Sequence, residues 1–265
     1  MFRLLRRIQR KRLASRPLPA EWEPIIAAHL PFAARFDAEE AALWRTHLKV
    51  FVWEKHWIGA RGLEVTEAMK VVIAGQAARL TRRLPLDMYD RLTEIVIYPS
   101  HYKHPGREGA IVYGEAHHWG TVVLSWDAVE QGILHPSDGH DTALHEFAHV
   151  LDVADGWFDG TPQLHAGRDF HEWGRVLGRY FTELQASPDQ GIVRAYGATN
   201  EAEFFAVATE AFFERPKTLR RKAPKLYQEL RRFYRVDPAR LPPLADPSAA
   251  PTRSSPKRAR RRKRR

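Results

Sequence analysis

The chain is organised around residues 138–152, which have the sequence DGHDTALHEFAHVLD. The apolar residues of this stretch recur at the spacing of one helix face, at Leu144, Phe147, Ala148 and Leu151. The pattern predicts a mostly buried helix from about Asp141 to Val153. Asp138 or Asp141 is suited to cap its first turn, and Gly156 is suited to end it.

Within this stretch, His145, Glu146 and His149 form an H-E-x-x-H motif. Side chains four residues apart share one face of a helix, so both imidazoles can bind one Zn²⁺ ion at about 2.0–2.1 Å. The Glu beside the first His can then take a proton from a water molecule on the metal. The alternative is a helix with two metal-free histidines. The apolar flanks argue against it, because two buried histidines and a buried Glu need partners.

A catalytic zinc site of this kind needs a third protein ligand, and two positions compete for that role. A ligand close behind the motif would be Asp155, but Asp152 stands where such sites need a glycine for a sharp turn. Glu203 lies further along, in the first turn of a helix that Asn200 is suited to open. Because its spacing from Asn200 is also that of a capping box, the ligand role and the capping role both remain open.

The segments around this helix predict an α+β fold, a mostly helical single domain with a small mixed sheet. Residues 24–84 have a helical pattern, in which Thr66 is suited to cap a helix that ends near Leu80. Short apolar runs bounded by Gly, Pro and His predict three strands, at residues 94–98, 110–113 and 121–126. Further helices are expected near residues 170–183, 200–213 and 217–234.

The composition limits the class of protein. The 265 residues contain no cysteine, which excludes disulfides and cysteine metal sites. The net charge of +10 comes from the ends, because residues 1–16 and 253–265 together carry sixteen Lys and Arg and no acidic residue. Residues 17–252 have a formal charge of −6, which argues against nucleic-acid binding by the folded body.

The chain divides into three predicted parts: a basic N-terminal segment at 1–19, a folded domain at 20–242 and an Arg-rich tail at 243–265 that is expected to be disordered. The first segment is suited to a short amphipathic helix. Two interpretations of it are open, contact with a membrane and a frayed terminus. Its apolar residues are Phe2, Leu5, Ile8 and Leu13. We expect the tail to be a solubilising segment. A contact with nucleic acid or an anionic surface is the less favoured alternative. No apolar run suits a signal peptide or a transmembrane segment, so we expect a cytoplasmic protein.

Several long segments, in the same order, resemble the bacterial MtfA (Mlc titration factor A) family of zinc peptidases over roughly residues 20–240. They are GEAHHWGTVVLSWDAV at 114–129, DGHDTALHEFAH at 138–149, HEFAHVLD at 145–152, YGATNEAEFFA at 196–206 and EAFFERP at 210–216. The two zinc-site segments and KAPKLYQEL at 222–230 also resemble the catalytic domain of anthrax lethal factor.

The resemblance implies a gluzincin-like site built on a zincin-type active-site helix. In such a site His145, His149 and Glu203 would bind one Zn²⁺ ion. Glu146 would act as general base, and the hydroxyl of Tyr196 would donate a hydrogen bond to the oxyanion. Residues 20–242 would then form a zinc metallopeptidase domain that acts on peptide or protein substrates, as an aminopeptidase-like enzyme or by limited proteolysis.

The resemblance also implies a link to the Mlc repressor, which controls glucose-phosphotransferase genes. The alternative function is a non-catalytic binding protein that sequesters such a transcriptional repressor. The intact Glu146 favours the peptidase, because a scaffold has no need of that carboxylate. We also expect Asp152 or Glu210 to orient a zinc-binding histidine. Residues 121–126 are either an edge strand beside the cleft, to which a peptide could add, or an internal strand.

Overall fold

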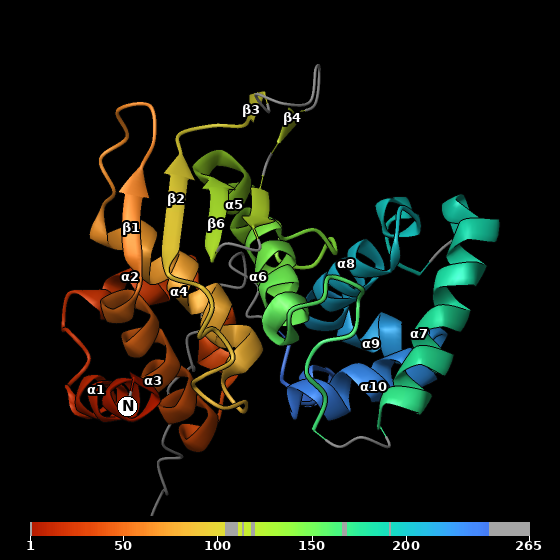
Figure 1. Ribbon diagram of the computed structural model, residues 1–265, viewed down its shortest axis with the longest axis horizontal. Helices are drawn as coiled ribbons and strands as arrows, with labels where there is room; N and C mark the ends of the chain where they lie inside the picture. The colour runs from red at the N-terminus through yellow and green to blue at the C-terminus, as the bar shows by residue number, and fades with distance from the viewer. Residues whose placement is uncertain are drawn as a thin grey trace, which may run out of the picture.

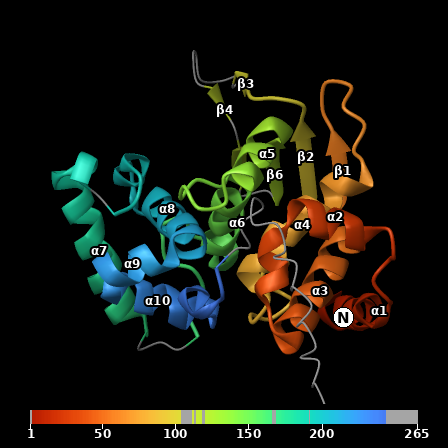
Figure 2. The same cartoon turned by 180° about the vertical axis from the view of Figure 1, so that it is seen from behind.

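Helix α6 (Thr142–Asp152) carries the H-E-x-x-H motif and runs through the middle of the molecule. All of its residues are buried. The computed structural model describes residues 2–103, 111–112, 114–117, 120–165, 169–190 and 192–243. On one side of α6 lie the sheet and the N-terminal helices, and on the other side lie helices α7 to α10 (Figure 1). Figure 2 shows the same division from behind. The helix is therefore held from both sides.

A four-stranded mixed sheet stands on one side of α6. In spatial order its strands are β1 (His56–Gly59), β2 (Glu94–Tyr98), β6 (Thr121–Ser125) and β5 (Gly114–His117). The first three are parallel, whereas β5 pairs antiparallel with β6 and forms an edge that packs against α6. A separate antiparallel pair, β3 (Tyr102–Lys103) and β4 (Ile111–Val112), projects beyond this sheet (Figure 1).

Helices make up most of the described chain. On the N-terminal side they are α1 (Phe2–Ser15), α2 (Trp22–His29), the 3₁₀ helix η1 (Pro31–Arg35), α3 (Ala38–Glu54) and α4 (Glu67–Thr81). After the sheet come α5 (Trp126–Leu134), α6, η2 (Val153–Asp155), α7 (Asp169–Ala186), η3 (Pro188–Gln190), η4 (Ala195–Ala198), α8 (Glu201–Glu214), α9 (Pro216–Lys222), α10 (Pro224–Tyr234) and η5 (Pro238–Arg240). The observed α+β class, mostly helical with a small mixed sheet, confirms the prediction.

The predicted caps form at the starts of α4 and α6, and at the start of α8, where Asn200 accepts the Glu203 N–H. The side chain of Thr66 accepts the Met69 N–H at the start of α4. Asp141, rather than Asp138, caps α6 by accepting the Leu144 N–H at 2.9 Å. At the other end, Gly156 closes η2 with a positive φ of 111°, a conformation that a side chain would strain. Local chemistry therefore fixes the start of the motif helix and the end of the 3₁₀ turn that follows it.

An aromatic cluster anchors the motif helix to the N-terminal half. The ring of Phe147, which lies between the two motif histidines in sequence, packs edge-on against Phe51 with centroids 5.4 Å apart. It also contacts Tyr89, at 5.7 Å. Burying such a ring contributes roughly 1.5–3 kcal/mol. Since Phe147 points into this cluster, the motif side chains on the opposite face of α6 are directed toward α8.

Three expectations require correction. The predicted helical segment 24–84 contains a strand, β1, because Trp57 and Ile58 pair in parallel with β2. The predicted helix at 217–234 is two helices, because Pro224 starts α10 and cannot continue α9. The edge role suggested for residues 121–126 is wrong, since β6 lies between β2 and β5. Of the strand expected at 110–113, only Ile111–Val112 lies within the described residues.

The N-terminal segment forms a helix that is docked onto the domain. Leu13 is buried, whereas Leu5 and Ile8 are exposed. Arg10 pairs with Glu54 on α3 and with Asp90, which argues against a frayed terminus. Across the residues that the structure describes, no helix has both the length and the apolar character needed to cross a bilayer. The disorder predicted for the tail concerns residues that, from 244 onward, lie outside the described part of the chain.

The packing of α4 generates a stability prediction. A Cβ at Gly75 would collide with Leu30 Cδ1 and lie 3.3 Å from Trp44 Cζ2. We expect Gly75→Ala to lower the free energy of unfolding by about 1–3 kcal/mol, measured by urea denaturation. The control is Gly174→Ala on α7, where a Cβ meets no atom within 4 Å. That substitution should raise stability by up to about 1 kcal/mol. Equal stability of the two variants would show that the contact is not tight.

Candidate metal centre

Three side chains from two helices converge at the centre of the molecule. Nε2 of His145 lies 3.1 Å from Nε2 of His149, one turn further along α6. Oε2 of Glu203, in the first turn of α8, lies 3.0 Å from the His145 nitrogen and 3.4 Å from the His149 nitrogen. Among the described residues, this is the group of His, Asp and Glu side chains whose geometry could hold a metal ion.

The spacing of these three atoms fits a zinc ion. Donors that lie 2.0–2.1 Å from a tetrahedral Zn²⁺ are about 3.3 Å from one another. The three distances observed here, 3.0, 3.1 and 3.4 Å, are close to that value. Two imidazole nitrogens and one carboxylate oxygen are also ligand types that zinc accepts, and three protein ligands leave one position open.

A second carboxylate holds His145 from behind. Oε1 of Glu210 lies 2.8 Å from Nδ1 of His145, so the imidazole has a carboxylate at each of its two nitrogens. Glu210 is fully buried, and its other oxygen accepts the N–H of Asp141 at 2.7 Å. Arg194 pairs with the same carboxylate. Glu210 thereby fixes which His145 nitrogen faces Glu203, which is how a metal-binding imidazole is commonly oriented.

The site attracts positive charge. Burial lowers the pKa of His145, but hydrogen bonds to Glu203 and Glu210 outweigh it and raise the pKa to about 10. Burial likewise opposes the charge of Glu203, yet its bonds to His145 and His149 bring its pKa well below the ordinary value. The protein therefore stabilises a positive charge at this point, which either a proton or a metal cation can supply.

Glu146 lies against the edge strand of the sheet. Its side chain is buried, and a Cβ added to Gly114 would come within 2.6 Å of both its Cγ and its Oε1. A glycine at this point of β5 is therefore what allows the carboxylate to lie beside the strand. The motif glutamate is thus confined between α6 and the β5 edge.

Tyr196 lies on η4, beside the cluster. Its ring centroid is 5.9 Å from that of His145, and the side chain is half exposed. Partial burial and the negative charge of Glu203 raise the pKa of its phenol to about 12, so the hydroxyl keeps its proton and can donate a hydrogen bond. On the other side, the ring of Phe158 lies 4.8 Å from that of His149.

The structure brings together all five residues that the sequence singled out, and it places the Glu203 carboxylate beside the two motif histidines. Helix α6 continues through Asp152 without a turn, and Asp152 accepts the N–H of Gly160 at 3.0 Å. The backbone N–H of Glu203 is capped by Asn200, while its carboxylate points to the histidines. The Asn200 side chain therefore caps the helix, while the Glu203 side chain contacts His145 instead of returning the second bond of a capping box.

Other parts of the arrangement carry no signal in the sequence. Arg194 is two residues before Tyr196 but gives no local sign of its contact with Glu210. Gln76, on α4, donates to the second oxygen of Asp141 at 2.6 Å and so steadies the cap of α6. Neither contact follows from spacing, because each joins segments far apart in the chain.

Comparisons with known proteins agree with this geometry. Residues 5–235 match the family described as "Glucose-regulated metallo-peptidase M90". An uncharacterized protein of the cyanobacterium Synechocystis is 32% identical over 242 residues, which cover 86% of this chain and 88% of that protein.

Mlc titration factor A of Yersinia pestis is 30% identical over 241 residues, which cover 84% of this chain and 87% of that protein. The same protein of Yersinia pseudotuberculosis has the same identity and coverage. The family match spans the sheet, the motif helix and α8 together, so it includes every residue of the cluster. The chain is therefore a member of the glucose-regulated metallo-peptidase M90 family and a relative of Mlc titration factor A.

Proposed function

We propose that this protein is a zinc-dependent peptidase that hydrolyses a peptide bond by attack of a water molecule. The observation that carries the proposal is the meeting of His145, His149 and Glu203 in one cluster with zinc-like spacing. In this proposal the three side chains hold one Zn²⁺ ion. Zinc in such a site supplies Lewis acidity, which lowers the pKa of a water molecule toward about 7 and polarises a carbonyl group.

Glu146 is proposed to move the protons of the reaction. It is the next residue after His145 and is confined beside β5, so its carboxylate has little freedom to turn away. It accepts the proton of the attacking water and then passes it to the leaving amine. A carboxylate in this position contributes typically 10²- to 10⁴-fold to the rate.

Tyr196 is proposed to stabilise the negative charge that develops on the substrate carbonyl oxygen. Support comes from its position beside His145 and from the raised pKa, which keeps the hydroxyl protonated at neutral pH. A protonated phenol can donate a hydrogen bond to an oxyanion, whereas a phenolate cannot.

The substrate is proposed to bind along the β5 edge. Among the strands of the described residues, β5 pairs with β6 on one side and with none on the other, and it lies against α6 at the position of Glu146. An extended peptide can add to an open strand edge through backbone hydrogen bonds. The edge role that was one alternative for residues 121–126 is proposed instead for their antiparallel partner, Gly114–His117.

Finer aspects of the function stay predictions. We expect aminopeptidase-like activity. The name of the Yersinia relatives, Mlc titration factor A, supports the proposal of an Mlc-type repressor as a partner. A non-catalytic protein that sequesters such a repressor is the alternative. The cytoplasmic location and a weak contact of the Arg-rich tail with nucleic acid or an anionic surface also remain predictions.

Replacement of the general base separates the two functions. We expect Glu146→Gln to lower kcat/KM on peptides by 10²- to 10⁴-fold, because the water then lacks a proton acceptor. Zinc content, measured by atomic absorption, should stay at the wild-type level. Peptide hydrolysis is followed by chromatography of the products. Full biological effect of this variant on repressor-controlled genes would contradict the catalytic proposal and favour sequestration.

Removing the charge behind His145 tests the proposed metal site. We expect Glu210→Gln to weaken zinc binding by 10- to 100-fold, since the imidazole loses the carboxylate that orients it and raises its basicity. Affinity is measured by competition with a chromophoric chelator. Glu201→Gln is the control, because Glu201 lies on the same helix but is exposed. Equal zinc affinity of the Glu210 variant and the control would remove the role given to Glu210.

The contact between β5 and Glu146 generates a third test. We expect Gly114→Ala to lower kcat by at least about tenfold, because the added methyl group must displace the Glu146 carboxylate from its place. Zinc content should not change, since no metal-holding side chain is touched. Gly178→Ala on α7, which meets no atom within 4 Å, is the matched control. Wild-type kcat in Gly114→Ala would mean that the position of Glu146 does not depend on this strand.

A further inference from the structure

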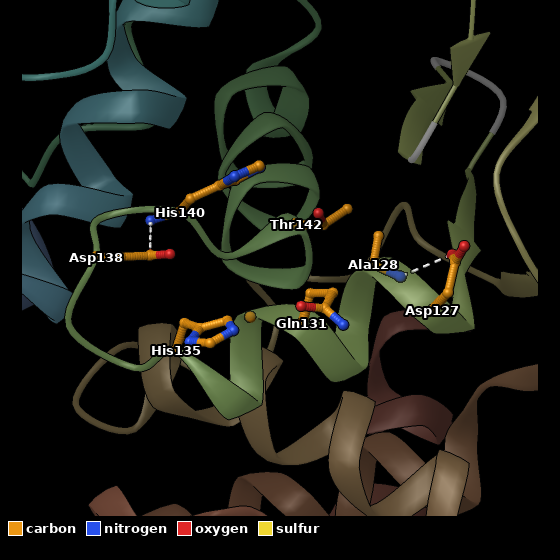
Figure 3. Close-up of a pocket in the computed structure, with 8 residues that line it drawn as sticks. Asp127, Ala128, Gln131, His135, Asp138, His140 and Thr142 are labelled. Carbon is orange, nitrogen blue, oxygen red and sulfur yellow. Dashed lines mark hydrogen bonds between the residues drawn. The ribbon is translucent and has the colours of Figure 1, made fainter.

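A cavity of about 420 Å³ lies at the start of the motif helix, where Thr142 lines it one turn before His145. It is formed by α5, by the loop between α5 and α6 and by the first residue of α6 (Figure 3). Its lining residues are Asp127, Ala128, Gln131, Gly132, His135, Asp138, His140 and Thr142. The cavity has room for more than one amino-acid side chain, and the roles proposed so far leave it unused.

The cavity is close enough to the cluster to hold a neighbouring part of a substrate. Thr142 lines it and precedes His145 by three residues and Glu146 by four, so these side chains are on one face of α6. Three to four residues correspond to about 5–6 Å along a helix. An extended peptide advances about 3.3 Å per residue. A side chain within one or two residues of the cleaved bond can therefore reach the cavity.

The lining of the cavity carries negative charge. Among the described residues that form it there are two aspartates and no lysine or arginine. Asp138 and His140 lie at one end and Asp127 lies at the other, with Gln131 and Thr142 between them (Figure 3). Burial, and then the charge of Arg194, lower the pKa of His140, so this imidazole is neutral at pH 7. Asp127 also accepts the backbone N–H of His101, whose ring nitrogen Nδ1 lies 3.4 Å from the same carboxylate oxygen. No lysine or arginine of the lining opposes the charges of the two aspartates.

An anionic ligand is disfavoured here although a helix begins at the cavity. The N-terminus of α6 is already occupied, because Asp141 accepts the Leu144 N–H and is itself buried. Arg194, the cation whose charge acts on His140, is paired with Glu210.

We propose that this cavity binds a cationic group of the peptide substrate, a lysine or arginine side chain within one or two residues of the cleaved bond. Asp127 and Asp138 supply the opposite charge, and Gln131 and Thr142 supply neutral hydrogen-bonding groups. The inference rests on the proposed peptidase function and names the substrate class that this site selects.

The test compares two N-acetylated, fluorescently labelled peptides that differ only in lysine versus norleucine. Their binding to the zinc-loaded Glu146→Gln protein is measured by fluorescence anisotropy, so that cleavage does not interfere. We expect the lysine peptide to bind about fivefold more tightly at low salt, the effect of one partly exposed ion pair. High ionic strength should reduce this preference. Equal affinities of the two peptides would overturn the proposal.

Substitutions assign the preference to the cavity. Asp127→Asn and Asp138→Asn keep one oxygen that can accept the N–H groups of Ala128 and His140, whereas the contact of the second Asp127 oxygen with the His101 N–H is lost. The double variant should bind both peptides equally. Glu130→Gln is the control, since Glu130 is exposed on the same helix α5 but does not line the cavity. The ratio of two affinities in one sample does not depend on the folded fraction. A preference that survives the double variant, or that Glu130→Gln also removes, would refute the cavity's role.

Two further arms complete the design. A norleucine peptide with a free amino terminus tests whether the cavity instead holds the α-amino group, and tighter binding than its acetylated form would overturn the assignment to a side chain. Cleavage of the acetylated norleucine peptide by the wild-type zinc-loaded protein tests the peptidase function by itself. A lysine preference in binding without any cleavage would refute hydrolysis while it supports the cavity.

Discussion

The centre of this protein is one imidazole ring held by two carboxylates of the same helix. Glu203 and Glu210 are seven residues apart on α8, two turns or about 10.5 Å, and so lie on one face. One contacts Nε2 of His145 and the other contacts Nδ1. This arrangement requires α8 to pack closely on α6 in one register. A shift of one helical position would leave a buried imidazole and a buried carboxylate without partners.

Burial of these polar groups opposes folding, and the surrounding packing offsets it. The face of α6 opposite the histidines enters the aromatic cluster of Phe147, Phe51 and Tyr89. Glu210 is satisfied by three groups from different segments: His145, the backbone of Asp141 and Arg194. A buried charge in such a place is retained when it has several hydrogen-bonding partners. Burying these groups lowers the stability of the fold, and the same groups favour a positive charge between them.

The same helix also relates the cluster to the surfaces around it. The Glu146 side of α6 faces the β5 edge, where Gly114 leaves room for the Glu146 carboxylate beside the strand. The first residue of α6 lines the cavity between α5 and the start of this helix. Along α6, Thr142 at the cavity is followed by His145, by Glu146 beside the β5 edge and by His149. An extended peptide could contact them in turn, because their spacing is comparable to that of a few residues.

Local patterns in the chain were sufficient for the α+β class, the motif helix and the helix caps at Thr66 and Asn200, since caps and helical periodicity depend on residues within a turn of each other. Spacing and a family resemblance also pointed to Glu203. The strand β1, the edge position of β5 and the contacts of Arg194 and Gln76 became evident only in the folded chain. Each of these joins segments that are distant in sequence, and such pairings are selected by the packing of the whole core rather than by any local propensity.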